Sequence, residues 1–265
     1  MKNDKQVFGT YEWAVENANF INGCSNNCKY CYSREMAIRF KRKTAENWNI
    51  EEVNFIQLKK KIKKANGFIM FPSSHDITPV NLSYSLVFLK KLLDAGNNVL
   101  IVSKPHLEVV KAICNQFYEF KTRILFRFTI GSKNSKILKF WEPEATDYNE
   151  RKECLIYAYR HEFATSISCE PMLDNKTKEL VKDLEPYVTN YIWIGKANFL
   201  LRRLSMNGIN DTKTLNQANK LLVWQSDENI RKLYNDLKSN PKIKWKESIK
   251  KIVNIEVSTI KGLDR

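Results

Sequence analysis

Three cysteines lie close together near the start of the chain, in the sequence Gly23-Cys24-Ser25-Asn26-Asn27-Cys28-Lys29-Tyr30-Cys31-Tyr32. Their spacing is C-x3-C-x2-C. Thiolates are the ligands that iron–sulfur clusters use, and a [4Fe–4S] cluster has four irons to bind. If Cys24, Cys28 and Cys31 bind three of these irons, the fourth stays open to a small molecule. The loop therefore predicts an iron–sulfur site with one exchangeable position.

A structural zinc site is the competing interpretation of these thiols. Such sites use four tetrahedral ligands, often supplied by two C-x2-C pairs. A second pair is absent here, because the other cysteines are scattered at Cys114, Cys154 and Cys169, and the chain has only three histidines. Buried structural cysteines behave as small apolar side chains, which fits poorly with three in one polar loop. The sequence favours the open cluster.

Charge and composition limit the compartment and the partners. The N-terminal sequence MKNDKQVFGT has no apolar core of the signal-peptide type, and no apolar run approaches the ~18–20 residues of a membrane span. We therefore expect a cytoplasmic protein with no membrane partner. The net charge of +15 suits a nucleic acid partner, but a Lys-, Asn- and Ile-rich composition alone also explains it.

Short apolar runs alternate with longer amphipathic segments over the first 200 residues. The predicted strands cover residues 11–15, 68–71, 99–102, 123–130, 165–169 and 191–194. The predicted helices cover residues 33–43, 51–65, 82–95, 107–117, 147–161 and 176–184. This alternation is typical of βαβ units and a parallel sheet. Six such units are short of the eight that close a full barrel.

The predicted fold is therefore α/β, a partial (β/α)6 TIM-type barrel with parallel strands. A doubly wound sheet would also suit the number of units. Residues 1–200 form the predicted barrel, with the cysteine loop at residues 20–32. Residues 201–265 form a polar, helical C-terminal extension packed on the barrel. The cysteine loop follows the first predicted strand, at the sheet edge where ligands of α/β folds gather.

The cysteine spacing, with an aromatic residue before the last cysteine, resembles the signature of the radical S-adenosylmethionine (radical SAM) superfamily. The resemblance implies that the open iron binds S-adenosylmethionine. Reductive cleavage of this cofactor then gives a 5′-deoxyadenosyl radical. It also implies an electron donor such as flavodoxin or ferredoxin.

Four segments resemble the spore photoproduct lyase-like branch of DNA repair enzymes. They are residues 28–32, Ser73-Ser74-His75-Asp76, Val102-Ser103-Lys104, and residues 126–132 followed by Glu142-Pro143 and Arg151. The resemblance implies a nucleic acid substrate, in repair or in base modification. One position departs from the branch. The hydrogen-donating cysteine of the lyase aligns with Ser73, whose O–H bond is too strong to quench a carbon radical.

A second resemblance is to a phage-associated three-cysteine radical SAM family. Its segments are Tyr11-Glu12-Trp13, residues 168–173 and Trp193-Ile194-Gly195. This resemblance leaves the substrate open, so a protein, a peptide or a small molecule stays an alternative. A non-enzymatic, metal-stabilised binding protein is a further alternative.

These resemblances imply roles for individual residues, each with an ordinary alternative. The implied cofactor contacts are Ser74, Lys104, Thr129, Ser132 and Glu170. The implied catalytic positions are Tyr30, Tyr32, Ser73, His75 and Cys169. The two tyrosines either relay a hydrogen or shield the cluster, and His75 is a substrate contact, an acid or an ordinary loop residue. Cys169 is either a replacement hydrogen donor or a buried core residue.

Basic residues gather in four runs, at 39–43, 59–64, 202–203 and 242–251. Such runs are usually solvated helix faces. The nearby aromatic residues Phe40, Trp48 and Trp245 would suit base stacking. Only gathering of these residues around the cysteine loop would favour a nucleic acid site. Arg127 lies between two phenylalanines and points to the opposite face of its strand, where it either lines the barrel and binds an anion or lies at the surface.

Overall fold

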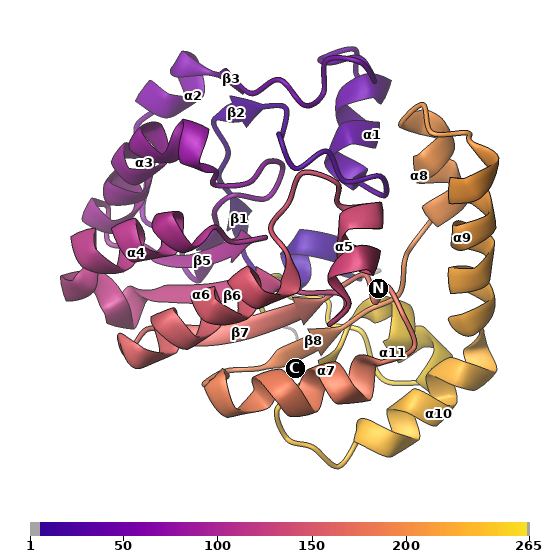
Figure 1. The fold of residues 1–265 in the computed structure, drawn as a ribbon. Helices are drawn as coiled ribbons and strands as arrows, with labels where there is room; N and C mark the ends of the chain where they lie inside the picture. The colour runs from indigo at the N-terminus through magenta and orange to yellow at the C-terminus, as the bar shows by residue number, and fades with distance from the viewer. Residues whose placement is uncertain (1–5, 264–265) are drawn as a thin grey trace, which may run out of the picture.

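A parallel sheet curled into a half-barrel forms the centre of the molecule in the computed structural model, which describes residues 6–263 (Figure 1). The strand order is β1-β4-β5-β6-β7-β8-β9, and every neighbouring pair is parallel. The strands are β1 (Glu16–Asn17), β4 (Phe68–Met70), β5 (Asn98–Ser103), β6 (Ile124–Thr129), β7 (Ala164–Cys169), β8 (Ile192–Ile194) and β9 (Ile243–Trp245). A separate antiparallel pair joins β2 (Ile21–Asn22) to β3 (Glu52–Val53).

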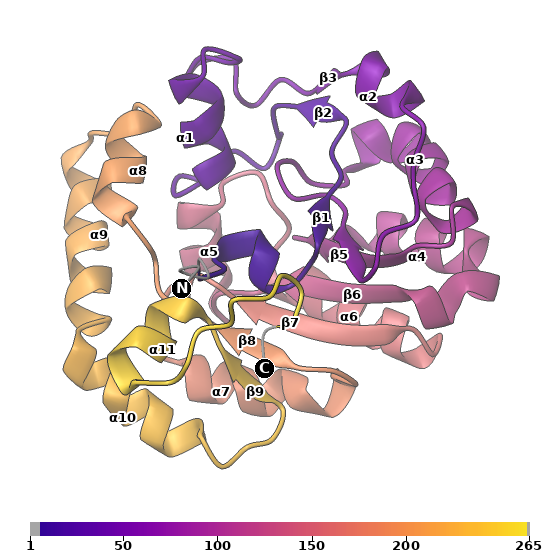
Figure 2. The ribbon, with the colours of Figure 1, turned by 180° about the vertical axis from the view of Figure 1, so that it is seen from behind.

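Helices cover the outer face of the sheet and continue into the C-terminal region (Figures 1 and 2). Those of the first 200 residues are α1 (Tyr32–Arg39), α2 (Phe55–Lys59), α3 (Leu82–Asp94), α4 (Leu107–Gln116), α5 (Ser135–Trp141), α6 (Tyr148–Arg160) and α7 (Thr177–Leu184). Those that follow are α8 (Leu200–Met206), α9 (Thr212–Trp224), α10 (Asp227–Leu237) and α11 (Glu247–Val253). Both views place α1 and α8 side by side at one edge of the molecule.

The two faces of the sheet differ in character because side chains alternate along each strand. On β6, Phe126 and Phe128 belong to the main core beneath the helices, while Leu125 packs in a small cluster inside the half-barrel. Arg127 and Thr129 share the inner face with Leu125. The inside of the half-barrel, here called the lumen, is therefore polar toward the carboxyl ends of the strands.

Local sequence features explain where α6 begins and where α3 ends. Asp147 caps α6, because its Oδ1 accepts a hydrogen bond from the Glu150 backbone N–H at 3.0 Å. The buried residues of α3 include Phe88, Leu89, Leu92 and Leu93, at the spacing of one helix face. Gly96 follows α3 with φ of +81°, a backbone conformation that favours glycine.

The predicted partial barrel with parallel strands is confirmed, but three elements differ from the prediction. The segment 11–15 is not a strand: a 3-10 helix covers Gly9–Glu12, and the first strand of the sheet is β1. The predicted helix 51–65 shrinks to α2. At the end of α2, Lys91 Nζ donates hydrogen bonds to Leu58 O at 2.5 Å and to Lys60 O at 2.9 Å. Beyond that end, the Asn97 side chain accepts a hydrogen bond from Ala65 N at 2.7 Å and donates one to Lys63 O at 3.2 Å. These bonds hold the lysine-rich segment in a non-helical path.

The third difference lies in the C-terminal extension, which contributes β9 to the sheet in addition to its helices. Ile243 and Trp245 are buried on either side of Lys244, the alternation expected of a strand. The strand was missed because three residues inside a lysine-rich run give little signal. Within residues 6–263, no helix is both long and apolar enough to cross a bilayer.

Candidate active site

The cysteine loop connects β2 to α1 at the carboxyl edge of the sheet. Cys24 and Cys28 are buried and Cys31 is half-buried. Cys31 also caps α1, with its Sγ 3.4 Å from the Arg34 backbone N–H. Gly23 has φ of +97°, and a Cβ at this position would lie 2.2 Å from Ile50 O. Only glycine therefore lets the loop pass this close to the neighbouring chain.

Residues distant in sequence fix the shape of this loop. The Asn207 side-chain amide donates hydrogen bonds to the carbonyl oxygens of Lys29 and Cys31, at 3.0 Å each. The Glu51 carboxylate accepts hydrogen bonds from Ser25 N at 3.0 Å and from Ser25 Oγ at 2.8 Å. Because these partners come from separate elements, the loop is held on several sides before any ligand binds.

The donor set of the loop fits an iron–sulfur cluster better than a single metal ion. Among residues 6–263, no group of three His, Cys, Asp or Glu side chains could hold one metal ion. In a [4Fe–4S] cluster each thiolate binds a different iron, so the sulfur atoms need not converge on one point. Burial raises the pKa of Cys28 to about 12 and raises that of Cys24 as well. Thiolates at these positions therefore need compensating positive charge, which the iron of a cluster would supply.

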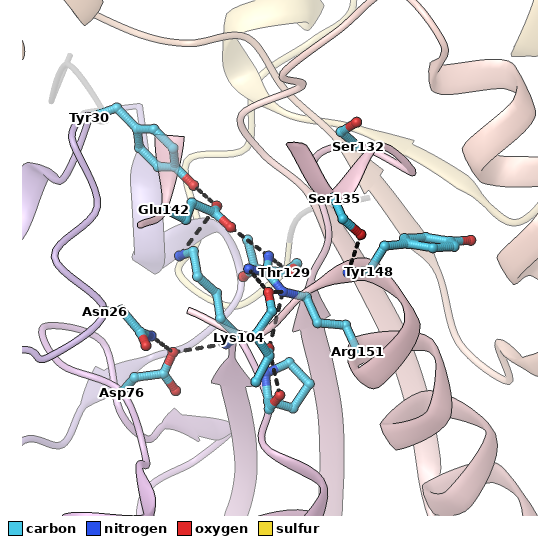
Figure 3. A network of polar contacts seen from close by, with 12 residues as sticks. Asn26, Tyr30, Asp76, Lys104, Thr129, Ser132, Ser135, Glu142, Tyr148 and Arg151 are labelled. Atoms are coloured by element: carbon cyan, nitrogen blue, oxygen red, sulfur yellow. Dashed lines mark hydrogen bonds and ion pairs between the residues drawn. The ribbon is translucent and has the colours of Figure 1, made fainter. Parts of the chain in front are cut away.

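A buried network of charged side chains lies beside the loop (Figure 3). Glu142 accepts a hydrogen bond from the Tyr30 hydroxyl, and its Oε2 lies 2.6 Å from Arg151 NH1. The Nζ of Lys104 lies 3.9 Å from Glu142 Oε1. Arg151 also donates to Thr146 O, at 2.9 Å from Nε and 2.7 Å from NH2, and to Thr129 O at 3.1 Å. The network joins the cysteine loop to β5, β6 and α6.

Asp76 ties the same loop to the end of β5. Its Oδ2 accepts hydrogen bonds from the Asn26 side chain and from the Lys104 backbone N–H, at 2.8 Å each. Its Oδ1 accepts from the Ser103 hydroxyl. Burial alone would lower the pKa of Lys104, but Cys28, Glu142 and Asp76 outweigh it and raise that pKa. Lys104 therefore carries a positive charge next to the cysteine loop.

The loop after β4 places Ser73 and Ser74 near Tyr32. Asn19 fixes both serines, because its Oδ1 accepts from Ser73 N at 2.8 Å and Ser74 N at 2.9 Å, and its Nδ2 donates to Ser73 Oγ at 2.8 Å. The Tyr32 hydroxyl donates to Ser73 O. The structure thus brings together three residues that the sequence placed at the site, although Ser73 and Ser74 are 41 or more positions from Tyr32.

His75 is turned into the protein. Its ring packs edge-on against Phe20 and Phe71, with centroids 5.3 and 6.2 Å away, and Nδ1 lies 3.0 Å from Asp76 O. Burial lowers the pKa of His75 to about 4. At neutral pH its imidazole is therefore uncharged, which disfavours a role as an acid.

Other predicted residues lie further from the cysteines. Cys169 is fully buried in the core on the outer face of the sheet, away from the lumen, and burial raises its pKa. This placement agrees with the interpretation as a core residue. The Ser132 hydroxyl donates to Asp174 and accepts from Asn134 N at 2.8 Å, so it is engaged away from Lys104 (Figure 3). Glu170 Oε2 lies 3.6 Å from the buried Lys246 Nζ.

Arg127 lies in the wall of the lumen. Its guanidinium lies 4.5 Å from the Trp13 ring centroid and 5.2 Å from the Trp193 ring centroid, and Nε donates to Ser166 Oγ at 2.9 Å. Arg127 is 4% exposed, so it is not a surface arginine. It belongs to the lumen wall, below the level of Lys104.

Sequence reasoning missed Asn19, Glu51 and Asn207, which shape the site through hydrogen bonds to the loops that carry the predicted site residues. Their residue type is common in loops and caps, and no spacing links them to the cysteines. The Lys246 ammonium was also missed, because the run 242–251 was expected to be solvated. Instead Lys246 is 1% exposed and its Nζ lies 2.5 Å from Glu12 Oε1.

No family model matches the sequence, and no curated protein matches it either. Solved structures are similar in fold. A substituted variant of spore photoproduct lyase with dinucleoside spore photoproduct superposes with a TM-score of 0.54, and a doubly substituted variant with bound AdoMet and the same dinucleoside gives 0.53. Each is 14% identical to this chain and matches 78% of it. This chain spans 64% of the length of each lyase chain. The half-barrel therefore has the fold of spore photoproduct lyase.

Proposed function

We propose that this protein is a radical SAM enzyme. Cys24, Cys28 and Cys31 hold a [4Fe–4S] cluster whose open iron binds S-adenosylmethionine. A one-electron donor such as flavodoxin or ferredoxin would supply the electron for the cluster. With cluster and cofactor bound, the chemistry supplied would be reductive cleavage of S-adenosylmethionine into methionine and a 5′-deoxyadenosyl radical, used for hydrogen abstraction from a substrate in the lumen.

One observation carries this proposal. Three thiols share one braced loop at the carboxyl edge of a parallel half-barrel, and Lys104, which directly follows β5, lies beside this loop with its Nζ 5.8 Å from the Tyr30 ring centroid. Polar ligands of parallel α/β folds bind at this edge. The fold similarity to spore photoproduct lyase, which has been solved with AdoMet, supports the same assignment.

The chain's own residues would bind and orient the cofactor. Lys104 offers an ammonium to a carboxylate, as a single point charge with three donors. Thr129 ends β6 and Glu170 directly follows β7, so both lie at the carboxyl edge of the sheet, where they can contact the polar part of an adenosyl group. Tyr30 is buried and hydrogen-bonded to Glu142, which suits shielding of the cluster from water.

We further propose that the substrate is a nucleic acid. The net charge of +15 favours phosphate-bearing partners, and the lyase with the same fold has been solved with a dinucleoside lesion. The final step must differ from quenching by a thiol at the lyase's donor position, since Ser73 has a hydroxyl there. Cys169 is turned away from the lumen and does not replace it.

Anaerobic reconstitution tests the proposal. The reconstituted protein should bind iron and sulfide and show the visible absorbance of an iron–sulfur cluster. With dithionite as the reductant, it should form 5′-deoxyadenosine from S-adenosylmethionine. Cys24→Ala should lose the absorbance and the product. Cys114→Ala is the matched control, because this buried core cysteine lies on α4 outside the loop. If Cys24→Ala retains both signals, the ligand assignment is wrong.

A further inference from the structure

Exposed apolar side chains form a row along α1, directly after the last cysteine of the loop. Tyr32, Met36 and Phe40 are spaced four residues apart, so they lie above one another on the helix surface. They are 41%, 37% and 57% exposed. Such a row normally faces a core, whereas this one faces solvent.

The row continues onto α8 through an arginine. Phe199 precedes α8, has a left-handed backbone with φ of 54°, and is 65% exposed. The Arg203 guanidinium lies 5.9 Å from the Tyr32 ring centroid and 6.0 Å from that of Phe199. Arg203 therefore lies between the two rings. We call the row Tyr32, Met36, Phe40 and Phe199, with the arginines beside it, the α1–α8 track.

Arginines accompany both ends of the track. The guanidinium groups of Arg39 and Arg42 each lie 5.8 Å from the Phe40 ring centroid. Arg202 lies 4.7 Å from the Phe199 ring centroid. Proteins that bind single-stranded nucleic acid combine exposed aromatic rings, on which bases stack, with cations that follow the phosphates. The track has both components.

An ion pair holds the two helices of the track together. Arg202 NH2 lies 2.8 Å from Glu35 Oε1, and Arg203 Nε lies 3.7 Å from Glu35 Oε2. Figures 1 and 2 both show α1 and α8 adjacent at this edge. The aromatic rings are therefore presented by packed helices and not by separate mobile loops.

The track leads into the candidate active site. Tyr32 follows Cys31 and donates a hydrogen bond to Ser73 O, across the mouth of the half-barrel. The Arg203 guanidinium lies 5.9 Å from the ring centroid of this tyrosine, so the cationic part of the track also reaches the mouth. An electron carrier needs only to approach the cluster from outside. A partner bound along the track instead reaches the lumen, which favours the substrate as its occupant.

We propose that the α1–α8 track binds single-stranded nucleic acid and directs one nucleotide toward the lumen. This inference rests on the proposed nucleic acid substrate. The eight helical steps from Tyr32 to Phe40 span about 12 Å at 1.5 Å per residue. This is about the length of three stacked nucleotides at 3.4 Å each.

The test uses the full chain with its cluster reconstituted, without S-adenosylmethionine, so that binding is measured apart from turnover. A fluorescein-labelled single-stranded dodecamer of mixed sequence, as DNA and as RNA, is titrated by fluorescence anisotropy. Phe40→Ala and Phe199→Ala should each raise the Kd by about fivefold or more, the loss expected for one stacked base. Phe55→Ala is the matched control, because Phe55 is 51% exposed on α2, and its Kd should be unchanged.

A second pair of variants tests the cationic part. Arg39→Gln, beside Phe40, should reduce the slope of log K against log salt by about one, while Arg231→Gln on α10 should leave it unchanged. The proposal is overturned if both phenylalanine variants bind as tightly as the unmodified protein, or if neither dodecamer binds. It is also overturned if these variants slow only the reduction of the cluster by flavodoxin, since the track then belongs to an electron carrier. A protein that binds the dodecamer through the track but forms no 5′-deoxyadenosine would instead overturn the proposed function.

Discussion

Replacing Arg151 with methionine tests whether the buried network beside the cysteine loop stabilises the fold as its geometry implies. Arg151 and Glu142 are both fully buried, with NH1 and Oε2 2.6 Å apart. Methionine keeps much of the arginine's length but has neither charge nor donors. Removing one partner of a buried ion pair leaves an uncompensated charge and costs about 3–5 kcal/mol.

Two further effects, the remaining charge of Lys104 and two carbonyls left without donors, modify this cost in free energy. Lys104 remains 3.9 Å from Glu142, so the charge term falls at the low end of that range, about 3 kcal/mol. The carbonyls of Thr146 and Thr129 lose their donors, which adds about 1–3 kcal/mol. We therefore expect Arg151→Met to lower the free energy of unfolding by about 4–6 kcal/mol. Arg151→Lys keeps the charge but not the planar guanidinium with its several donors, and should lower the free energy of unfolding by about 1–3 kcal/mol.

Equilibrium urea unfolding of the cluster-free chain at pH 7, followed by circular dichroism, measures these losses. Glu142→Gln and the double variant complete a cycle, whose coupling energy should exceed about 1 kcal/mol. A loss below about 1 kcal/mol for Arg151→Met, or a coupling energy near zero, would refute the reasoning.

The pH dependence of folding stability provides a further check, because it depends on the charge of Glu142. Burial raises the pKa of Glu142, but Arg151 and Lys104 outweigh it and hold that pKa below its usual value. A carboxyl whose folded pKa is lowered contributes stability above the unfolded pKa of about 4.3, and this contribution is lost as the pH falls through the folded value. The difference in stability between the unmodified chain and Arg151→Met should therefore narrow below about pH 4.

Three other predictions concern single residues around the site. Lys104→Met should weaken S-adenosylmethionine binding about tenfold or more, the worth of one charge-assisted hydrogen bond, as measured by equilibrium dialysis; unchanged binding would remove Lys104 from the cofactor site. Asn207→Ala removes both hydrogen bonds to the loop carbonyls and should speed loss of the cluster absorbance under a chelator several-fold, and an unaltered rate would show that the brace is dispensable. The ring of His75 stays neutral in the folded chain down to about pH 4, whereas it gains a proton in the unfolded chain below about pH 6.5. The free energy of unfolding therefore decreases as the pH is lowered from about 6.5 to about 4. His75→Phe should therefore lose about 2 kcal/mol less stability than the unmodified chain between pH 7 and 5 in urea unfolding, and equal losses would contradict a buried neutral ring.

The sequence predicted best the features that depend on neighbouring residues. The three cysteines lie in one short loop, so their spacing alone predicts a shared site. Lys104 was placed correctly at the sheet edge because it ends an apolar strand, and parallel strands bring their carboxyl ends together. The alternation of strands and helices predicted the half-barrel for the same reason.

Features that depend on distant contacts could not be predicted in this way. Asn207 contacts Cys31 across 176 positions of the sequence, and no local pattern marks an asparagine for that role. The helix predicted at 51–65 ends early because Lys91 and Asn97, which are distant in sequence, form hydrogen bonds with the backbone of four residues between 58 and 65. Cys169 could be assigned to the core only once the face of β7 was known, because a shift of one residue would turn it into the lumen.

The brace from Asn207 also has a consequence for the order of events during synthesis. Chains elongate at roughly 5–20 residues per second, so the 176 positions between Cys31 and Asn207 take about 9–35 s to add. The same interval separates the emergence of the three thiols from the ribosome and the emergence of Asn207, and during it the loop backbone lacks its clamp. Oxidation or capture of a stray metal competes with correct folding during this time. A delay in translation between α1 and α8 would lengthen this exposure without changing a single residue of the finished protein.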